Sequence, residues 1–149
     1  MNALGLEDNQ LPQMDEAHVI GDRGAELWRR TIPDLFKQTV ASFSEREAAV
    51  FFEQGVRWTW SELDREVDAM AHGLLALGLT KGDRVGIWSP NRYEWIMTQF
   101  ATARLGLILV TINPAYRVTE VEYVLNKVTC KAWVTAVRFK NSDYIGTLQ

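Results

Sequence analysis

The stretch 81–117 constrains the fold more than any other part of the sequence. It contains two short apolar runs rich in strand-forming residues, 85–88 and 107–112, and each is followed by a turn that contains proline. The residues between the runs carry apolar side chains at helical spacing, namely Ile96, Phe100 and Ala103. Two buried strands joined by a helix predict a βαβ unit with parallel strands and a right-handed crossover.

The two ends of the intervening helix are also marked in the sequence. Asn91 can cap the first turn through its side-chain oxygen, and Glu94 follows three residues later, as in a capping box. Gly106 can end the helix in the left-handed conformation.

Three further helix starts are predicted where a threonine precedes an acidic residue by three positions. The pairs are Thr31 with Asp34, Thr59 with Glu62, and Thr119 with Glu122. Trp28 is expected to pack beneath the first of these helices. The charged residues 62–68 of the second helix lie opposite an apolar stripe, so they are expected to form a solvated face.

A hairpin and a third strand complete the predicted elements. Residues 48–59 predict a β-hairpin beside the main sheet, with Gly55 taking a positive φ, and residues 132–136 predict a third strand. Strands that begin near residues 84, 107 and 132 and alternate with helices predict an α/β fold, with a mostly parallel sheet flanked by helices on both faces.

The two ends of the chain carry weaker patterns. Residues 1–24 are polar and unpatterned, which predicts a flexible leader before a domain that spans 25–149. Asp143-Tyr144-Ile145 predicts the opening of another helix near the other end of the sequence.

Composition narrows the class of protein. A net charge of −3 with both signs interspersed gives no reason to expect a nucleic-acid partner. The sequence has neither a window of about 18 apolar residues nor the pattern of a signal peptide, so no transmembrane segment is expected. Together with the single Cys130, this predicts a cytoplasmic protein. Six tryptophans and six phenylalanines are more than a small domain usually needs, and some are expected to face a partner.

Candidate ligand-binding residues lie where the predicted strands end, because ligands of open parallel sheets gather beyond the carboxyl ends of the strands. The turns there supply Asn91, Asn113, Tyr116 and Arg117, and the third strand is followed by Arg138 and Lys140. Each has a plain structural alternative. Asn91 can equally serve only as a helix cap, and Arg117 can equally serve only to pair with a nearby glutamate.

No catalytic or metal-binding constellation is complete in the sequence. His18, His72 and Cys130 are far apart and lack the spacing of a metal site or of a nucleophile with its base. No glycine-rich phosphate loop with a lysine is present either. Reasoning from the residues alone therefore leads as far as part of an open α/β domain.

Several motifs, taken in their order and spacing, resemble the adenylate-forming acyl-CoA synthetases, and most of all the bacterial medium- and long-chain fatty-acyl-CoA synthetases. These motifs are Thr59-Trp60-Ser61-Glu62-Leu63, the segment 73–78, Gly82-Asp83-Arg84-Val85-Gly86-Ile87, Ser89-Pro90-Asn91 with Glu94-Trp95, and Ile112-Asn113-Pro114-Ala115-Tyr116-Arg117. The resemblance runs from about Thr31 to Tyr144. Members of this family are several times longer, so it covers only their first subdomain.

The resemblance implies a two-step reaction. ATP with magnesium converts a carboxylate into an acyl-adenylate, and the thiol of coenzyme A then displaces AMP, which is a far better leaving group than a carboxylate oxygen. The family's catalytic groups are expected beyond Gln149, so no catalytic residue is assigned here. The chain is expected to be inactive alone and to bind none of ATP, magnesium and coenzyme A by itself.

The resemblance also implies partners. These are a fatty acid or other carboxylic acid as substrate of the full-length enzyme, and the remainder of the chain's own domain. Arg138 and Lys140 are expected to contact the phosphates of coenzyme A, as basic groups do near this position in some relatives. Two alternatives remain open: a non-catalytic interaction module on the same fold, and the N-terminal part of another adenylate-forming ligase, such as an aryl-CoA ligase or an adenylation domain.

Overall fold

The computed structural model describes residue 24 and residues 28–146, which form helices, a parallel sheet and two small hairpins. The elements are α1 (Ile32–Phe43), β1 (Glu47–Phe51), the short 3-10 helix η2 (Phe52–Gln54), β2 (Val56–Thr59), α2 (Trp60–Ala76), β3 (Arg84–Trp88), α3 (Tyr93–Leu105), β4 (Ile108–Ile112), α4 (Val118–Val128), β5 (Ala132–Thr135), β6 (Arg138–Phe139) and β7 (Ser142–Asp143). None of these helices is both long and apolar enough to cross a membrane. The predicted leader lies outside the described residues, apart from Gly24.

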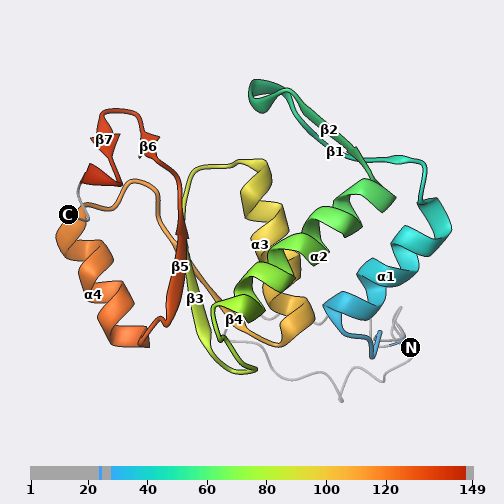
Figure 1. Ribbon diagram of the computed structural model, residues 1–149, viewed down its shortest axis with the longest axis horizontal. Coiled ribbons are helices and arrows are strands. Elements are labelled where there is room, and N and C mark those ends of the chain that lie inside the picture. The colour runs from blue at the N-terminus through green and yellow to red at the C-terminus, as the bar shows by residue number, and fades with distance from the viewer. Residues whose placement is uncertain (1–23, 25–27, 147–149) are drawn as a thin grey trace, which may run out of the picture.

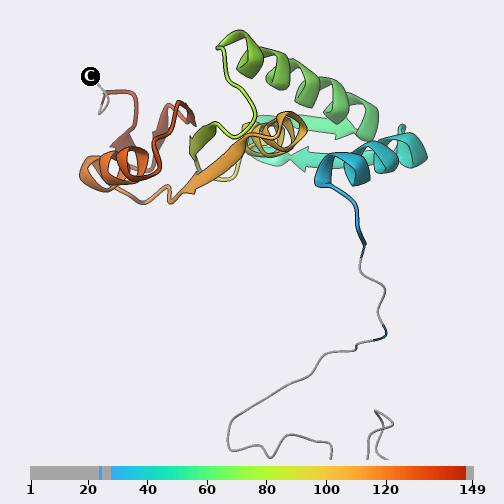
Figure 2. The same cartoon turned by 90° about the horizontal axis from the view of Figure 1, so that it is seen from below.

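A parallel sheet in the order β4-β3-β5 lies at the centre of the fold, with helices on both faces (Figure 1). The helices α1, α2 and α3 lie on one side of this sheet and α4 on the other, as the second view also shows (Figure 2). The predicted α/β architecture and the parallel βαβ unit are therefore confirmed. The hairpin β1–β2 also forms, as a separate antiparallel sheet, and Gly55 takes the predicted positive φ.

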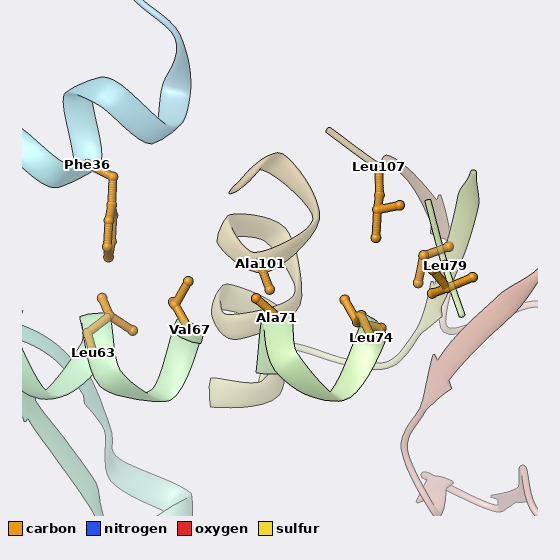
Figure 3. Packing of buried hydrophobic residues seen from close by; sticks show 9 residues of the cluster. Phe36, Leu63, Val67, Ala71, Leu74, Leu79, Ala101 and Leu107 are labelled. Atoms are coloured by element: carbon orange, nitrogen blue, oxygen red, sulfur yellow. The ribbon is translucent and has the colours of Figure 1, made fainter. Parts of the chain in front are cut away.

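The central strand β3 divides the core into two clusters because its side chains alternate between the faces. Val85 belongs to the first cluster, which α1, α2 and α3 supply, and Trp88 belongs to the second, which lies under α4. In the first cluster Ala71 of α2 faces Ala101 of α3, so these two helices approach closely (Figure 3). The predicted apolar stripe of α2 is buried here, at Leu63, Val67, Ala71 and Leu74.

Gly86 of β3 permits the close packing of α4 on the sheet. A Cβ atom at this position would lie 3.2 Å from Ile112 Cδ1 and 3.3 Å from Leu125 Cδ2. Both distances are tighter than ordinary van der Waals contact, so a side chain at position 86 would force Ile112 and Leu125 to shift by a few tenths of an ångström.

Two of the three predicted threonine–acid helix starts are confirmed. Thr31 and Asp34 form a capping box at α1, and Thr59 and Glu62 form one at α2. The third prediction was wrong, because α4 begins at Val118, before Thr119. Its start is fixed by Glu120, whose carboxylate accepts a hydrogen bond of 2.7 Å from the backbone N–H of Arg117.

Two other expectations were also wrong, and a third holds only in part. Trp28 does not pack beneath α1, since 75% of its surface is exposed. Residues 142–143 form strand β7, and Tyr144 and Ile145 form a turn, so no helix opens at Asp143. The charged face of α2 is not simply solvated: Arg104 of α3 donates to Asp64 at 2.6 Å and also to Asp68, which ties the two helices together.

Candidate functional site

A cleft of about 970 Å³ opens where β3 and β4 end, at the carboxyl edge of the parallel sheet. Its walls come from segments far apart in the sequence. They are the turn 89–92 with Trp95 after β3, the residues 111–114 at the end of β4, the hairpin residues 50–54, and Phe139. Open α/β sheets bind their ligands at this edge, so the cleft lies where the sequence predicts a site.

The hairpin wall is fastened to the first turn of α3 by Gln54. The side-chain oxygen of Gln54 accepts a hydrogen bond of 2.9 Å from the backbone N–H of Tyr93, and its amide nitrogen donates one of 3.1 Å to Glu94. Beside these bonds, the rings of Phe51 and Trp58 both make edge-to-face contacts with Tyr93. The predicted cap at Asn91 was therefore wrong: the N-cap of α3 is Arg92, and it makes no side-chain cap bond.

At the first turn of α3, the charges of Arg92 and Glu94 neutralise each other. Arg92 donates to both carboxylate oxygens of Glu94, at 3.2 and 3.0 Å. Burial pushes the pKa of Glu94 upward, but the hydrogen bonds from Arg92 and Gln54 outweigh burial and leave this pKa below its ordinary value. Hydrogen bonds to Glu94 in turn raise the pKa of Arg92, so both groups stay charged.

The structure brings two of the predicted polar residues into the cleft. Asn91 and Asn113 both line it and both are exposed. The side-chain oxygen of Asn113 also accepts a hydrogen bond of 2.9 Å from the N–H of Ala115, so this residue shapes the turn after β4 as well.

Tyr116 and Arg117 do not line the cleft. Tyr116 is half-buried against the second core cluster. Arg117 is exposed, and its side chain donates a hydrogen bond of 2.9 Å to the hydroxyl of Ser142, which joins the start of α4 to the hairpin β6–β7. The structural alternative for Arg117 was an ion pair of its side chain with Glu120 or Glu122. The structure shows a hydrogen bond to Ser142 instead.

Arg138 and Lys140 lie on the hairpin β6–β7, on either side in sequence of Phe139, which lines the cleft. Both are exposed, and the ammonium group of Lys140 lies 5.3 Å from the ring centroid of Phe139, which is a cleft residue. Exposed cations beside an apolar cleft wall can form charge-assisted hydrogen bonds with an anionic group.

Tyr144 is a residue near the cleft that the sequence analysis missed. It is fully buried and stacks on Trp88 with ring centroids 3.6 Å apart, and its hydroxyl donates to the carbonyl of Pro114. Burial raises its pKa, so the hydroxyl stays protonated as a donor. Its partners are 56 and 30 residues away, and no local pattern could have indicated them.

The described residues offer no constellation for metal binding or nucleophilic catalysis. Within this part of the chain, no three His, Cys, Asp or Glu side chains gather into a group that could hold a metal ion. Cys130 is a half-buried free thiol, and burial raises its pKa although Arg84 acts in the opposite direction. A raised pKa leaves little thiolate near neutral pH.

Comparison with known proteins gives consistent matches along the patterned chain. Residues 36–147 match the family described as "AMP-binding enzyme". The mitochondrial medium-chain acyl-CoA ligase ACSF2 of Danio rerio is 43% identical over 93% of this chain and 23% of its own length. The human ACSF2 is 45% identical over 89% of this chain and 22% of its own length. The putative acyl-CoA synthetase YngI of Bacillus subtilis is 36% identical over 80% and 22%, respectively. The chain spans less than a quarter of the length of these relatives.

Solved structures show the same fold. The N-terminal domain of FACL13 from Mycobacterium tuberculosis superposes with a TM-score of 0.69 at 28% identity, and the match covers 71% of this chain and 27% of that one. The N-terminal subdomain of NpsA from Klebsiella oxytoca superposes with a TM-score of 0.67 at 24% identity, with coverage of 74% and 28%.

Proposed function

Since this chain belongs to the AMP-binding enzyme family, we propose that it forms the N-terminal part of an ATP-dependent acyl-CoA synthetase. In the complete reaction a carboxylate oxygen attacks the α-phosphate of ATP and releases pyrophosphate. The thiol of coenzyme A then attacks the carbonyl carbon of the acyl-adenylate and releases AMP. The observation that carries this proposal is the 43% identity to a medium-chain acyl-CoA ligase along 93% of the chain.

The substrate that we assign is a medium- or long-chain fatty acid. Medium-chain acids are favoured because ACSF2 is named a medium-chain ligase. Positioning and stabilisation of developing charge govern reactions of this type. The described residues do not fit a magnesium site, so we derive no step through a metal for them.

In this proposal the described residues build one side of the substrate site. We assign Arg138 and Lys140 to the phosphates of coenzyme A, because both are exposed cations beside the cleft. We assign Asn91 and Asn113 to polar contacts with substrate, because their side chains line the cleft. Tyr116 and Arg117 act indirectly, since they lie outside the cleft and fix the turn and the hairpin that border it.

The remainder of the domain is the partner that we assign to the exposed apolar surface. Ile108, Val118 and Val137 are 47%, 47% and 67% exposed, and β4 and β5 each have an open edge within the described sheet. Open edges and exposed apolar side chains are typical of surfaces that another part of a protein covers.

We also propose a cytoplasmic location, which the free thiol of Cys130 favours. The ACSF2 relatives are named mitochondrial, so fractionation of the source cells distinguishes the two compartments. Recovery of the protein in mitochondria would overturn this part of the proposal.

The first test uses an antibody raised against this segment to capture the native protein. We expect an intact mass several times the 17.0 kDa of this chain, and we expect the captured protein to catalyse ATP–pyrophosphate exchange with octanoate. The 149-residue chain alone is expected to show no exchange. A native mass near 17 kDa, or clear exchange by the short chain, would contradict the proposal.

The coenzyme A contact is tested separately, because ATP–pyrophosphate exchange does not involve coenzyme A. In the longer protein, Arg138→Ala and Lys140→Ala should each raise KM for coenzyme A by about tenfold, the loss of one charge-assisted contact, and leave exchange unchanged. Lys37→Ala removes an exposed lysine from α1 and serves as the matched control. An unchanged KM for coenzyme A in both variants would overturn this assignment.

A further inference from the structure

The position of the hairpin wall, the residues 50–54 that line the cleft, depends on one side chain that no sequence motif indicates. A helix leaves its first N–H groups without partners inside the helix, and a side chain at the N-cap normally accepts from one of them. The N-cap of α3, Arg92, makes no such bond. The bond comes instead from Gln54, 39 residues earlier in the chain, which accepts from the N–H of Tyr93 at 2.9 Å.

The amide of Gln54 matches both of its partners. Its oxygen faces a donor, the N–H of Tyr93, and its nitrogen faces an acceptor, a carboxylate oxygen of Glu94 at 3.1 Å. Neither a carboxylate nor an aliphatic side chain of similar size can make both bonds. Glu94 also accepts hydrogen bonds from Arg92, which lines the cleft. Gln54 is therefore connected to Arg92 through Glu94.

Gln54 also determines where the tip of the hairpin lies. Phe52 is 93% exposed, so its own packing does not fix its position, yet it lines the cleft together with Val50 and Gln54. Gln54 closes η2, two residues after Phe52, and its two bonds attach this short helix to α3. The aromatic contacts of Phe51 and Trp58 with Tyr93 hold the two strands, up to the last pair before the tip, Phe51 with Val56. Gln54 adds the side-chain hydrogen bonds that come from the tip itself.

We infer that Gln54 is a positioning residue of the cleft: by replacing the missing cap of α3, it holds the hairpin tip and Phe52 at a fixed distance from the strand ends. The role in catalysis rests on the proposed function. The role of Gln54 in holding the hairpin tip does not rest on the proposed function, so an experiment can disprove either role without disproving the other.

The geometric test measures the distance across the cleft with spin labels on Glu53→Cys and Thr111→Cys, two exposed positions, in a Cys130→Ser background. We expect a narrow distance distribution in the parent protein and a clearly broader one in Gln54→Ala. Gln99→Ala removes an exposed glutamine from the same helix α3 and should leave the distribution narrow. Equal widths in all three proteins would overturn the inference.

Gln54→Glu gives a variant in which the attachment of the hairpin tip should depend on pH. Its carboxylate still accepts from Tyr93 but repels the carboxylate of Glu94 at neutral pH. At a pH low enough for the two carboxylates to share one proton, an O–H···O bond can replace the lost N–H···O bond. We expect a broad distribution at pH 7 that narrows again near pH 5, and a distribution that is equally narrow at both values would contradict the inference.

Hydrogen exchange provides a second readout at the bond itself. The amide of Tyr93 should exchange about tenfold faster in Gln54→Ala than in the parent, the effect expected for loss of one hydrogen bond. It should stay protected in Gln99→Ala. Unchanged protection of Tyr93 in Gln54→Ala would show that the bond does not form.

The kinetic test uses the longer ligase that the proposed function requires. Gln54→Ala should raise KM for the acid or for coenzyme A at least about fivefold with a smaller change in kcat, because it loosens the site without removing a reacting group. A broadened distance distribution with unchanged KM values would restrict Gln54 to a structural role. If the parent ligase is inactive, the proposed function fails, while the distance measurement still decides the geometric role.

Discussion

At the scale of single residues, Tyr144 joins the second core cluster to the turn after β4. Its hydroxyl donates to the carbonyl of Pro114, and its ring stacks on Trp88. Tyr144→Phe keeps the stack but removes the donor, so we expect the free energy of unfolding to fall by about 1–2 kcal/mol. Urea denaturation measures this change. The control is Tyr123→Phe, which removes a hydroxyl that accepts from Lys127 at an exposed position, where loss of the bond should cost little. Equal stability of Tyr144→Phe and the parent would contradict the assigned hydrogen bond.

Thr129 is held in a backbone conformation that suits it poorly. It ends α4 with φ 50° and ψ 55°, in the left-handed region that a β-branched residue seldom adopts. Glycine has no Cβ to clash there, so Thr129→Gly should raise the free energy of unfolding by about 0.5–1 kcal/mol. Thr119→Gly, placed in the first turn of the same helix, should lower it. Thermal denaturation of the two variants measures whether stability rises in Thr129→Gly and falls in Thr119→Gly. A loss of stability in Thr129→Gly would refute the argument.

At the scale of elements, short-range patterns predicted two of the helix starts that short-range contacts determine, and they misplaced the third, where Glu120 bonds to the backbone of Arg117. The boxes at Thr31 and Thr59 were found because a threonine and an acidic residue three positions apart contact each other across one turn. The start of α3 was misplaced because its cap comes from Gln54 in another element. The edge of the sheet and both asparagines of the cleft were predicted, whereas the hairpin wall depends on tertiary packing that no local spacing encodes.

The box at α2 predicts a dependence of stability on pH. Hydrogen bonds from the backbone and side chain of Thr59 lower the pKa of Glu62 below its ordinary value of 4.5. The charged carboxylate therefore stabilises the fold above the ordinary value, and this contribution is lost as the pH falls through the folded pKa. Glu62→Gln should be less stable than the parent at pH 7 and nearly equal to it at pH 3, measured by urea denaturation. Glu66→Gln on the same helix should show no such convergence, and a constant deficit in Glu62→Gln would rule out the mechanism.

At the scale of the whole molecule, the exposed apolar surface predicts how this chain behaves alone. The expectation that some aromatic residues face a partner is consistent with Trp28 and Phe52, which are 75% and 93% exposed. With two open sheet edges in the described part as well, the isolated chain should bind a hydrophobic dye and associate as its concentration rises. Dye fluorescence and light scattering measure this, with the longer protein that the proposed function requires as the control. A monodisperse monomer that binds no dye would instead favour a self-contained interaction module.

The division of the core into two clusters has a consequence for synthesis on the ribosome. The buried residues of the first cluster lie between Phe36 and Leu107, but the second cluster is not complete until Tyr144. Chains are made from the N-terminus at about 5–20 residues per second, so the helical layer α1–α3 can settle on β3 and β4 about 2–6 seconds before Tyr144 is added. In the first part of that interval, until α4 is complete at Val128, the opposite face of the new sheet, with Trp88 and Ile112, has no cover from the described residues. It is then a natural binding surface for a chaperone.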